Sequence, residues 1–203
     1  GGFREHEVTQ RCATFLHATV REDGAWPIDT NLSGWVTSLA AKVVELSNPE
    51  DLAEVIRSNA TKEIHPFTGA RHGGWGWSDL SGSVPDGDDT SGALVALSHL
   101  TNGVVSQEIE EGLRWLMWLQ NNDGGMPTFC KGWGKLPFDR STPDITAHAM
   151  LGMGLWLPYL SGELKKQVQK SYDRMLDWMK RTTNDEGWIP LWFGDQDATD
   201  EKA

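Results

Sequence analysis

The stretch Trp115-Leu116-Met117-Trp118-Leu119-Gln120-Asn121-Asn122-Asp123-Gly124-Gly125-Met126 decides the fold of this chain, because it joins the end of an apolar helix to a polar turn. In residues 105–120 the apolar side chains recur at steps of three and four residues, as expected for one buried helix face. These side chains are Ile109, Leu113, Leu116 and Leu119. Gly124 follows, and glycine readily adopts the left-handed backbone conformation found after helices. The stretch therefore predicts a helix that ends in a glycine turn.

The same pattern recurs along the chain, which indicates an internal repeat. Phe15-Leu16 is followed by Gly24-Ala25-Trp26, and Met175-Leu176 is followed by Gly187-Trp188. Gly73-Gly74-Trp75 ends a further copy whose helix is poorly marked. The turns are about 50 to 60 residues apart, a length suited to a helical hairpin. We interpret the turns as structural C-caps, in which a Trp ring packs back on the helix end.

Helical periodicity covers most of the chain, with little sign of strands. The predicted helices are Glu5–Val20, Ser33–Glu45, Pro49–Ser58, Asp89–Leu100, Ser106–Gln120, Asp144–Leu157 and Ser161–Lys180. The sequence thus predicts an all-α fold of helical hairpins, with residues 1–203 forming a single domain or a fragment of one.

Composition excludes several classes of protein. A net charge of −11 argues against a nucleic-acid partner, which needs a basic face. Cys12 and Cys130 lie far apart without metal-site spacing, so we expect a reducing, cytoplasmic compartment. We find no transmembrane run and no secretory signal. Eleven Trp accompany only two Tyr and six Phe, which indicates stacked structural indoles or an aromatic cavity of the kind that binds sugars or carbocations.

The run Val84-Pro85-Asp86-Gly87-Asp88-Asp89-Thr90 places three carboxyl groups within four residues at the start of a predicted helix. It has three interpretations. Asp is a common helix N-cap, and acidic side chains suit the first turn. Asp-rich loops also bind Mg²⁺ or Ca²⁺. Thirdly, crowding and burial raise the pKa of carboxyl groups, so one of them could stay neutral and act as an acid.

A second pattern joins a carboxylate to an imidazole. Asp144 and His148 are four residues apart, so they share one face of the predicted helix. Asp144 could then bind one ring nitrogen of His148 and leave the other pointing outward. The alternative is an ordinary pair on the surface of the helix.

Together these motifs resemble a known family. The helix–Gln–Gly–Trp repeat is similar to the QW motif of the squalene–hopene and oxidosqualene cyclases, although Met126 stands where its Trp would be and Val20 where the first Gln would be. Trp75-Gly76-Trp77 followed by Pro85 to Thr90 resembles the DxDD segment of the bacterial enzymes. Asp144-Ile145-Thr146-Ala147-His148 is similar to the Asp-Val-Thr-x-His of that family.

The resemblance implies a role for each of these residues. Asp88 would be the general acid that protonates a terminal alkene or an epoxide. Asp86 and Asp89 would hold and tune it. His148 would hydrogen-bond the acid and strengthen it, and Asp144 would orient His148.

The resemblance also suggests aromatic contacts to the substrate. Trp77 would stabilise a carbocation through its π face, or it packs in the core. Trp75 lies in the same segment, but as the end of a repeat it favours packing. Cys130 resembles a cysteine near the family's active site, and it would also suit a small apolar core position. Ser83 and Val84 stand where the family commonly has aromatics, which leaves the substrate open.

At the level of the whole protein, the resemblance implies an α/α barrel and a squalene-type or other polyprenyl substrate, with no cofactor and no metal. A closed barrel needs more helices than the seven predicted here, so we expect an incomplete barrel. A partner domain or a second copy would complete the cavity, and the enzyme could work at a membrane surface. Two alternatives stay open: a non-catalytic α/α-repeat module that binds a lipid or a protein, and an α/α toroid that acts on polysaccharide.

Overall fold

The computed structural model describes residues 3–26, 31–44, 47–66, 68–80, 82–131 and 137–187. The chain divides into two units, Gly1–Leu32 and Ser33–Ala203, and each is described by itself. The single domain expected over residues 1–203 therefore stays a prediction. The first unit contains helix α1 (Glu7–Thr19), none of whose residues is buried. The predicted repeat residue Trp188 lies outside the described residues.

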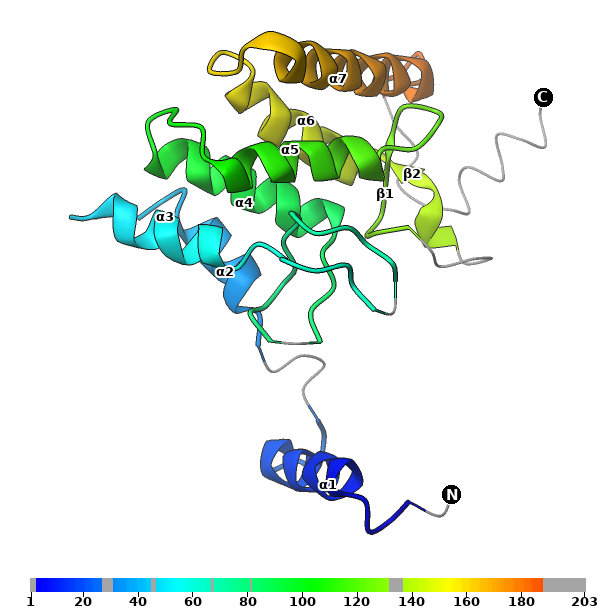
Figure 1. Ribbon diagram of the computed structural model, residues 1–203. Coiled ribbons are helices and arrows are strands. Elements are labelled where there is room, and N and C mark those ends of the chain that lie inside the picture. The colour runs from blue at the N-terminus through cyan, green and yellow to red at the C-terminus, as the bar shows by residue number, and fades with distance from the viewer. Residues whose placement is uncertain are drawn as a thin grey trace. The chain divides into compact units, whose positions relative to one another are not determined.

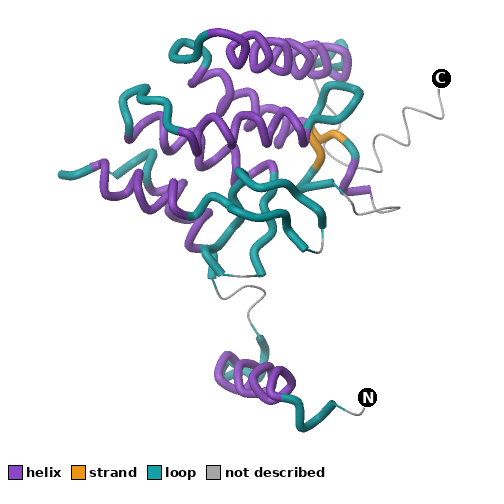
Figure 2. Tube along the Cα trace, viewed as in Figure 1, coloured by secondary structure: helices purple, strands orange, loops and turns teal. Residues whose placement is uncertain are grey.

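The second unit is helical, as Figures 1 and 2 show. Its helices are α2 (Ser33–Ala40), α3 (Pro49–Ser58), α4 (Gly87–Leu100), α5 (Gln107–Leu119), α6 (Pro143–Trp156) and α7 (Gly162–Thr182). Two short strands, β1 (Met126–Pro127) and β2 (Ser141–Thr142), pair antiparallel with Met126 opposite Thr142, and a 3-10 turn spans Pro137–Asp139. The predicted all-α fold is confirmed.

Consecutive helices of this unit form hairpins in two layers. Helix α4 packs between α2 and α6, so these three helices lie side by side in one layer. Helices α3 and α5 cover α4, while α7 covers α6 and also contacts α5. The hairpins are thus α2–α3, α4–α5 and α6–α7, which is the arrangement of successive hairpins in an α/α barrel.

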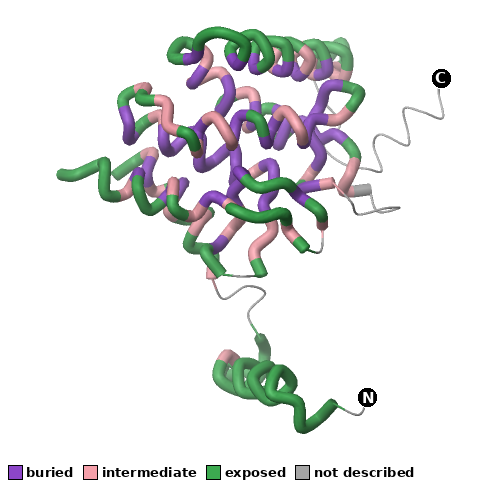
Figure 3. Tube along the Cα trace, viewed as in Figure 1, coloured by how far each residue is buried: buried purple, intermediate pink, exposed green. Residues whose placement is uncertain are grey.

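The core lies where the two layers meet, and α4 is the most buried helix (Figure 3). Leu94 and Leu97 of α4 pack with Leu116 of α5 and Trp156 of α6 in one hydrophobic cluster. The Trp156 Nε1 group donates a hydrogen bond to the Leu94 carbonyl at 2.9 Å, so this indole is buried with its polar group satisfied. The core therefore fixes α4 against α6, the two helices that carry Asp88 and His148.

The repeated turns have the predicted geometry. The four glycines of the repeat have positive φ angles: 81° at Gly24, 94° at Gly73, 105° at Gly124 and 82° at Gly187. The Trp26 indole N–H donates to the Leu16 carbonyl near the end of α1, at 2.7 Å. The buried Trp75 indole N–H donates in the same way to the Ile56 carbonyl near the end of α3, at 2.6 Å. The predicted packing of a Trp ring on a helix end is confirmed for Trp26 and Trp75. The residues that cap α1 and α3 are Val20 and Asn59, so the repeat glycines lie in turns beyond the caps.

Gln120, at the end of α5, connects its turn to α7. Its Nε2 donates to the carbonyls of Gly124 and Ser171, at 2.8 and 3.0 Å. Its Oε1 accepts from Ser171 Oγ and from Arg174 Nη1, each at 2.9 Å. The side chain is buried, with 6% of its surface exposed. One glutamine thus holds the α5 turn and helix α7 together.

The helix boundaries lie within two residues of the prediction, except at the end of α2. Helix α2 ends at Ala40 instead of Glu45, because residues 41–43 form a turn. Helix α4 begins at Gly87 instead of Asp89, because Asp86 caps it: its Oδ1 accepts a hydrogen bond from the Asp89 N–H at 2.8 Å. The two-residue strands are too short to give a period in the sequence.

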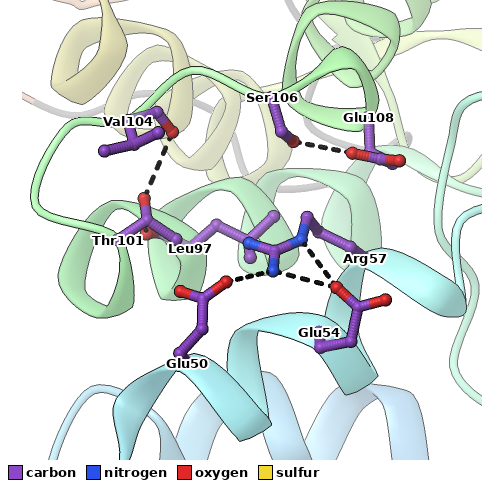
Figure 4. Close-up of polar contacts among 8 residues, drawn as sticks. All are labelled: Glu50, Glu54, Arg57, Leu97, Thr101, Val104, Ser106 and Glu108. Carbon is purple, nitrogen blue, oxygen red and sulfur yellow. Dashed lines mark hydrogen bonds and ion pairs between the residues drawn. The ribbon is translucent and has the colours of Figure 1, made fainter.

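Two sets of polar contacts, one within α3 and one at the start of α5, lie beside each other (Figure 4). Arg57 binds Glu50 and Glu54 of its own helix. Beside it, Ser106 Oγ donates to Glu108 Oε2 at 2.7 Å, and this hydrogen bond lowers the pKa of Glu108. Both glutamates that bind Arg57 are exposed, so these pairs contribute little stability.

Candidate active site

The start of α4 is held on two sides by backbone hydrogen bonds. The Asp86 N–H donates to the Trp75 carbonyl at 3.0 Å, and the Gly87 N–H donates to the Phe129 carbonyl at 2.8 Å. Thr90 Oγ1 accepts from the Trp75 N–H at 2.9 Å. These hydrogen bonds therefore fix the backbone of the segment that carries the three aspartates.

Asp86 and Asp89 are both buried. The capping interpretation is confirmed for Asp86. Within the described ranges, no group of three or more His, Cys, Asp or Glu side chains is placed to hold a metal ion.

Burial raises the pKa of both carboxyl groups. The pKa of Asp86 lies well above its usual range, first because the carboxyl group is buried and then because the charge of Asp89 repels its anion. Burial raises the pKa of Asp89 to about 6, where the charge of Asp88 adds to the rise while the hydrogen bond with Asp86 and the nearby His148 oppose it. Each of the two carboxyl groups therefore keeps its proton to a higher pH than an exposed aspartate does.

This pair makes stability depend on pH. Since the folded chain holds protons that the unfolded chain has lost, the free energy of unfolding should fall as the pH rises from about 4 through about 6. The stabilisation is complete below the ordinary value of 3.8 and is lost as Asp89 ionises; its shift from 3.8 to about 6 corresponds to about 3 kcal/mol. The higher pKa of Asp86 extends the fall to still higher pH.

Urea unfolding at a series of pH values measures this dependence. Asp89→Asn cannot ionise, so its profile should be flatter than that of the wild type over this range. Asp177→Asn is the matched control, because Asp177 is exposed on α7. Profiles of equal slope for the wild type and Asp89→Asn would contradict the raised pKa of Asp89.

Asp88 and His148 meet between α4 and α6. His148 Nδ1 lies 2.6 Å from Asp88 Oδ1, and the side chains are 22% and 39% exposed, respectively. Two glycines line this approach. A methyl group at Gly92 would lie 3.6 Å from His148 Cε1, which is an ordinary contact, whereas one at Gly152 would lie 3.3 Å from the Ser91 carbonyl oxygen, which is a tight contact. The structure thus brings together a carboxyl and an imidazole that are 60 residues apart.

Asp144 does not join this pair. It is exposed in the first turn of α6, and no hydrogen bond links it to the imidazole. Although Asp144 and His148 share a helix face, His148 Nδ1 is bound to Asp88 on α4. The role of Asp144 in orienting His148 stays a prediction.

The predicted aromatic residues lie close to the carboxyl cluster but differ in burial. The Trp75 ring is buried against Gly112 of α5, which is the packing role. Trp77 is partly buried, and its carbonyl accepts from the N–H groups of Gly34 and Trp35 at the start of α2, at 2.9 and 3.2 Å. Cys130 is a buried cysteine.

Three contributors to the site were missed in the sequence. Gly92 and Gly152 lie inside helices, where glycine is unfavourable, and this unusual position could have pointed to a close contact. Phe129 contributes its backbone carbonyl, which no sequence pattern reveals.

Comparison with known proteins relates this chain to terpene cyclases. The chain is 29% identical to the squalene-tetrahymanol cyclase of Tetrahymena thermophila over 183 residues, which cover 79% of this chain and 26% of that protein. It is 34% identical to the sporulenol synthase of Bacillus subtilis over 95 residues, 40% of this chain and 15% of the relative. These similarities support a relationship to the class II terpene cyclase family over a partial length.

A further comparison agrees with this relationship. The chain is 31% identical to a squalene hopane cyclase of Aspergillus fumigatus over 96 residues, 41% of this chain and 13% of that protein. No family model matches the chain. The chain spans 26% or less of the length of these curated relatives. The family resemblance seen in the sequence is thereby confirmed.

Proposed function

We propose that this chain is the acid-carrying part of a protonation-initiated terpene cyclase, with Asp88 as the general acid. The observation that supports this role is the 2.6 Å contact between Asp88 and His148 beside a buried carboxyl pair. The contact occupies Asp88 Oδ1, so Oδ2 is free to carry the acidic proton. An imidazole N–H that donates to Oδ1 would stabilise the carboxylate that remains after the proton has left.

The proposed step moves one proton. The π electrons of a terminal alkene take the proton from Asp88 Oδ2, so an O–H bond breaks and a C–H bond forms. A carbocation develops on the neighbouring carbon, and Asp88 becomes a carboxylate that His148 stabilises. The raised pKa values of Asp86 and Asp89 would limit the negative charge around the acid.

The surroundings suit an apolar substrate. Leu151 lies three residues after His148 on the same face of α6 and is exposed. Val36 and Leu39 of α2 are exposed as well. A polyprenyl chain of the squalene type could cover these side chains, and a partner domain or a second copy would complete the cavity. No helix of the described part is long and apolar enough to cross a membrane; contact with a membrane surface belongs to the proposal.

One observation favours the alternative of a non-catalytic binding module. The Asp88 side chain is 39% exposed, as is common for an acidic side chain in the first turn of a helix. A general acid that protonates an alkene must instead be shielded from water during the reaction. In the proposed enzyme, substrate and the missing part of the cavity would cover it.

A reaction in D₂O tests the proposal. The full-length protein would be incubated with squalene and a panel of shorter polyprenols, and the products analysed by mass spectrometry. Because the acidic proton exchanges with solvent, each cyclised product should gain one deuterium at the former alkene terminus. Products without deuterium would contradict protonation as the first step, and no conversion across the panel would favour the binding module.

A further inference from the structure

A small cavity lies beside the carboxyl cluster, on the side of α4 that faces α2 and α3. Its lining residues are Gly34, Thr37, Ser38, Ile56, Asn59, Trp75, Gly76 and Asp89. The space open to the centre of a water molecule is about 10 Å³. A cavity of this size has room for about one water molecule.

One wall of the cavity carries an unsatisfied polar atom. Asp89 Oδ1 is buried and has no hydrogen-bond partner, and 7% of the Asp89 surface is exposed. A buried polar atom without a partner destabilises the fold, and more so when it is charged. A hydrogen-bond donor in the cavity would remove this destabilisation.

The other polar side chains that line the cavity can also form hydrogen bonds. Thr37 and Ser38 present hydroxyl groups, and Asn59, at the end of α3, presents an amide. Among the described residues, none of these three side chains makes a hydrogen bond to the protein. A buried water typically makes two to four hydrogen bonds, which these groups and Asp89 can supply.

We propose that this cavity binds a single water molecule that donates a hydrogen bond to Asp89 Oδ1 and is held by the polar side chains of α2 and α3. Asp89 is the one ionisable side chain in the lining. Three other titratable side chains interact electrostatically with Asp89: Asp86 and Asp88 of its own segment, and His148 of α6.

The water would also affect the pKa of Asp89. A hydrogen bond donated to Asp89 stabilises its anion and so lowers its pKa. This water site would exist whether or not the chain initiates cyclisation, so its test does not rely on enzyme activity.

The experiment combines a high-resolution crystal structure with an NMR titration of ¹³C-labelled Asp89. In the wild type we expect a water peak within hydrogen-bond distance of Asp89 Oδ1. Ser38→Val should fill the cavity with methyl groups and expel the water, which raises the pKa of Asp89 by about one pH unit. Ser38→Ala leaves room for the water and should titrate like the wild type, and Ser98→Val on α4 is the control for adding methyl groups elsewhere.

Three results would overturn the proposal. The first is a wild-type cavity without density. The second is an Asp89 titration that is the same in the wild type and Ser38→Val. The third is a peak with oxygen contacts near about 2.4 Å, which would identify a cation. If Ser38→Val does not fold, the density in the wild-type cavity still decides the matter.

Discussion

Replacing Asp88 with asparagine should abolish cyclisation while leaving the fold intact. Asparagine has the shape of aspartate and can still accept a hydrogen bond from His148, but it cannot give up a proton. General acid catalysis is typically worth about 10²- to 10⁴-fold, and here the protonation is the step that starts the reaction. Because 39% of the Asp88 side chain is exposed, the substitution should change stability little. Product formation by mass spectrometry and thermal unfolding by circular dichroism measure the two effects.

Two matched variants separate the roles around the acid. His148→Gln keeps a hydrogen-bonding group but loses the imidazole, so turnover should fall and its dependence on pH should change. Asp144→Asn changes an exposed carboxylate without a bond to the imidazole, so turnover should stay close to that of the wild type. A large loss in Asp144→Asn would restore its predicted role in orienting His148. Turnover retained in Asp88→Asn would place the acid elsewhere.

The helices of the second unit could be predicted because each buries one face. Residues 105–120 show this most clearly, and the structure places Ile109, Leu113, Leu116 and Leu119 in the core. Helix α4 was harder to delimit, because it is buried nearly all round and lacks an apolar stripe. Its start at Gly87 depends on the Asp86 cap, and the sequence offered capping as only one of three interpretations.

The sequence predicted which residues form the candidate site, but not which of them contact each other. Periodicity put Asp144 and His148 on one helix face, yet the imidazole binds Asp88 on another helix. That contact depends on how closely α4 and α6 pack, and at Gly152 a side chain would lie 3.3 Å from the backbone of α4. The same limit applies to the cavity at Asp89, because its walls come from three helices and a loop.

Gln120→Leu should lower the free energy of unfolding by about 3–5 kcal/mol. The leucine side chain is similar in volume but cannot pair with the carbonyls of Gly124 and Ser171, which are both buried residues. Each buried group left without a partner costs about 1–3 kcal/mol. The Ser171 hydroxyl also loses its acceptor, whereas Arg174 keeps the carbonyl of Asn121 at 2.8 Å.

The location of these bonds determines which part of the structure should fail. All of them lie between the α5 turn and α7, so α7 should separate before the α4–α6 contact is lost. Hydrogen exchange would then show faster exchange in α7 at denaturant concentrations that leave α4 protected. Gln107→Leu is the control, since Gln107 is exposed on α5 and bonds only Glu111, so it should change the free energy of unfolding by less than about 0.5 kcal/mol. Equal losses in the two variants would mean that Gln120 contributes through its volume and not through its hydrogen bonds.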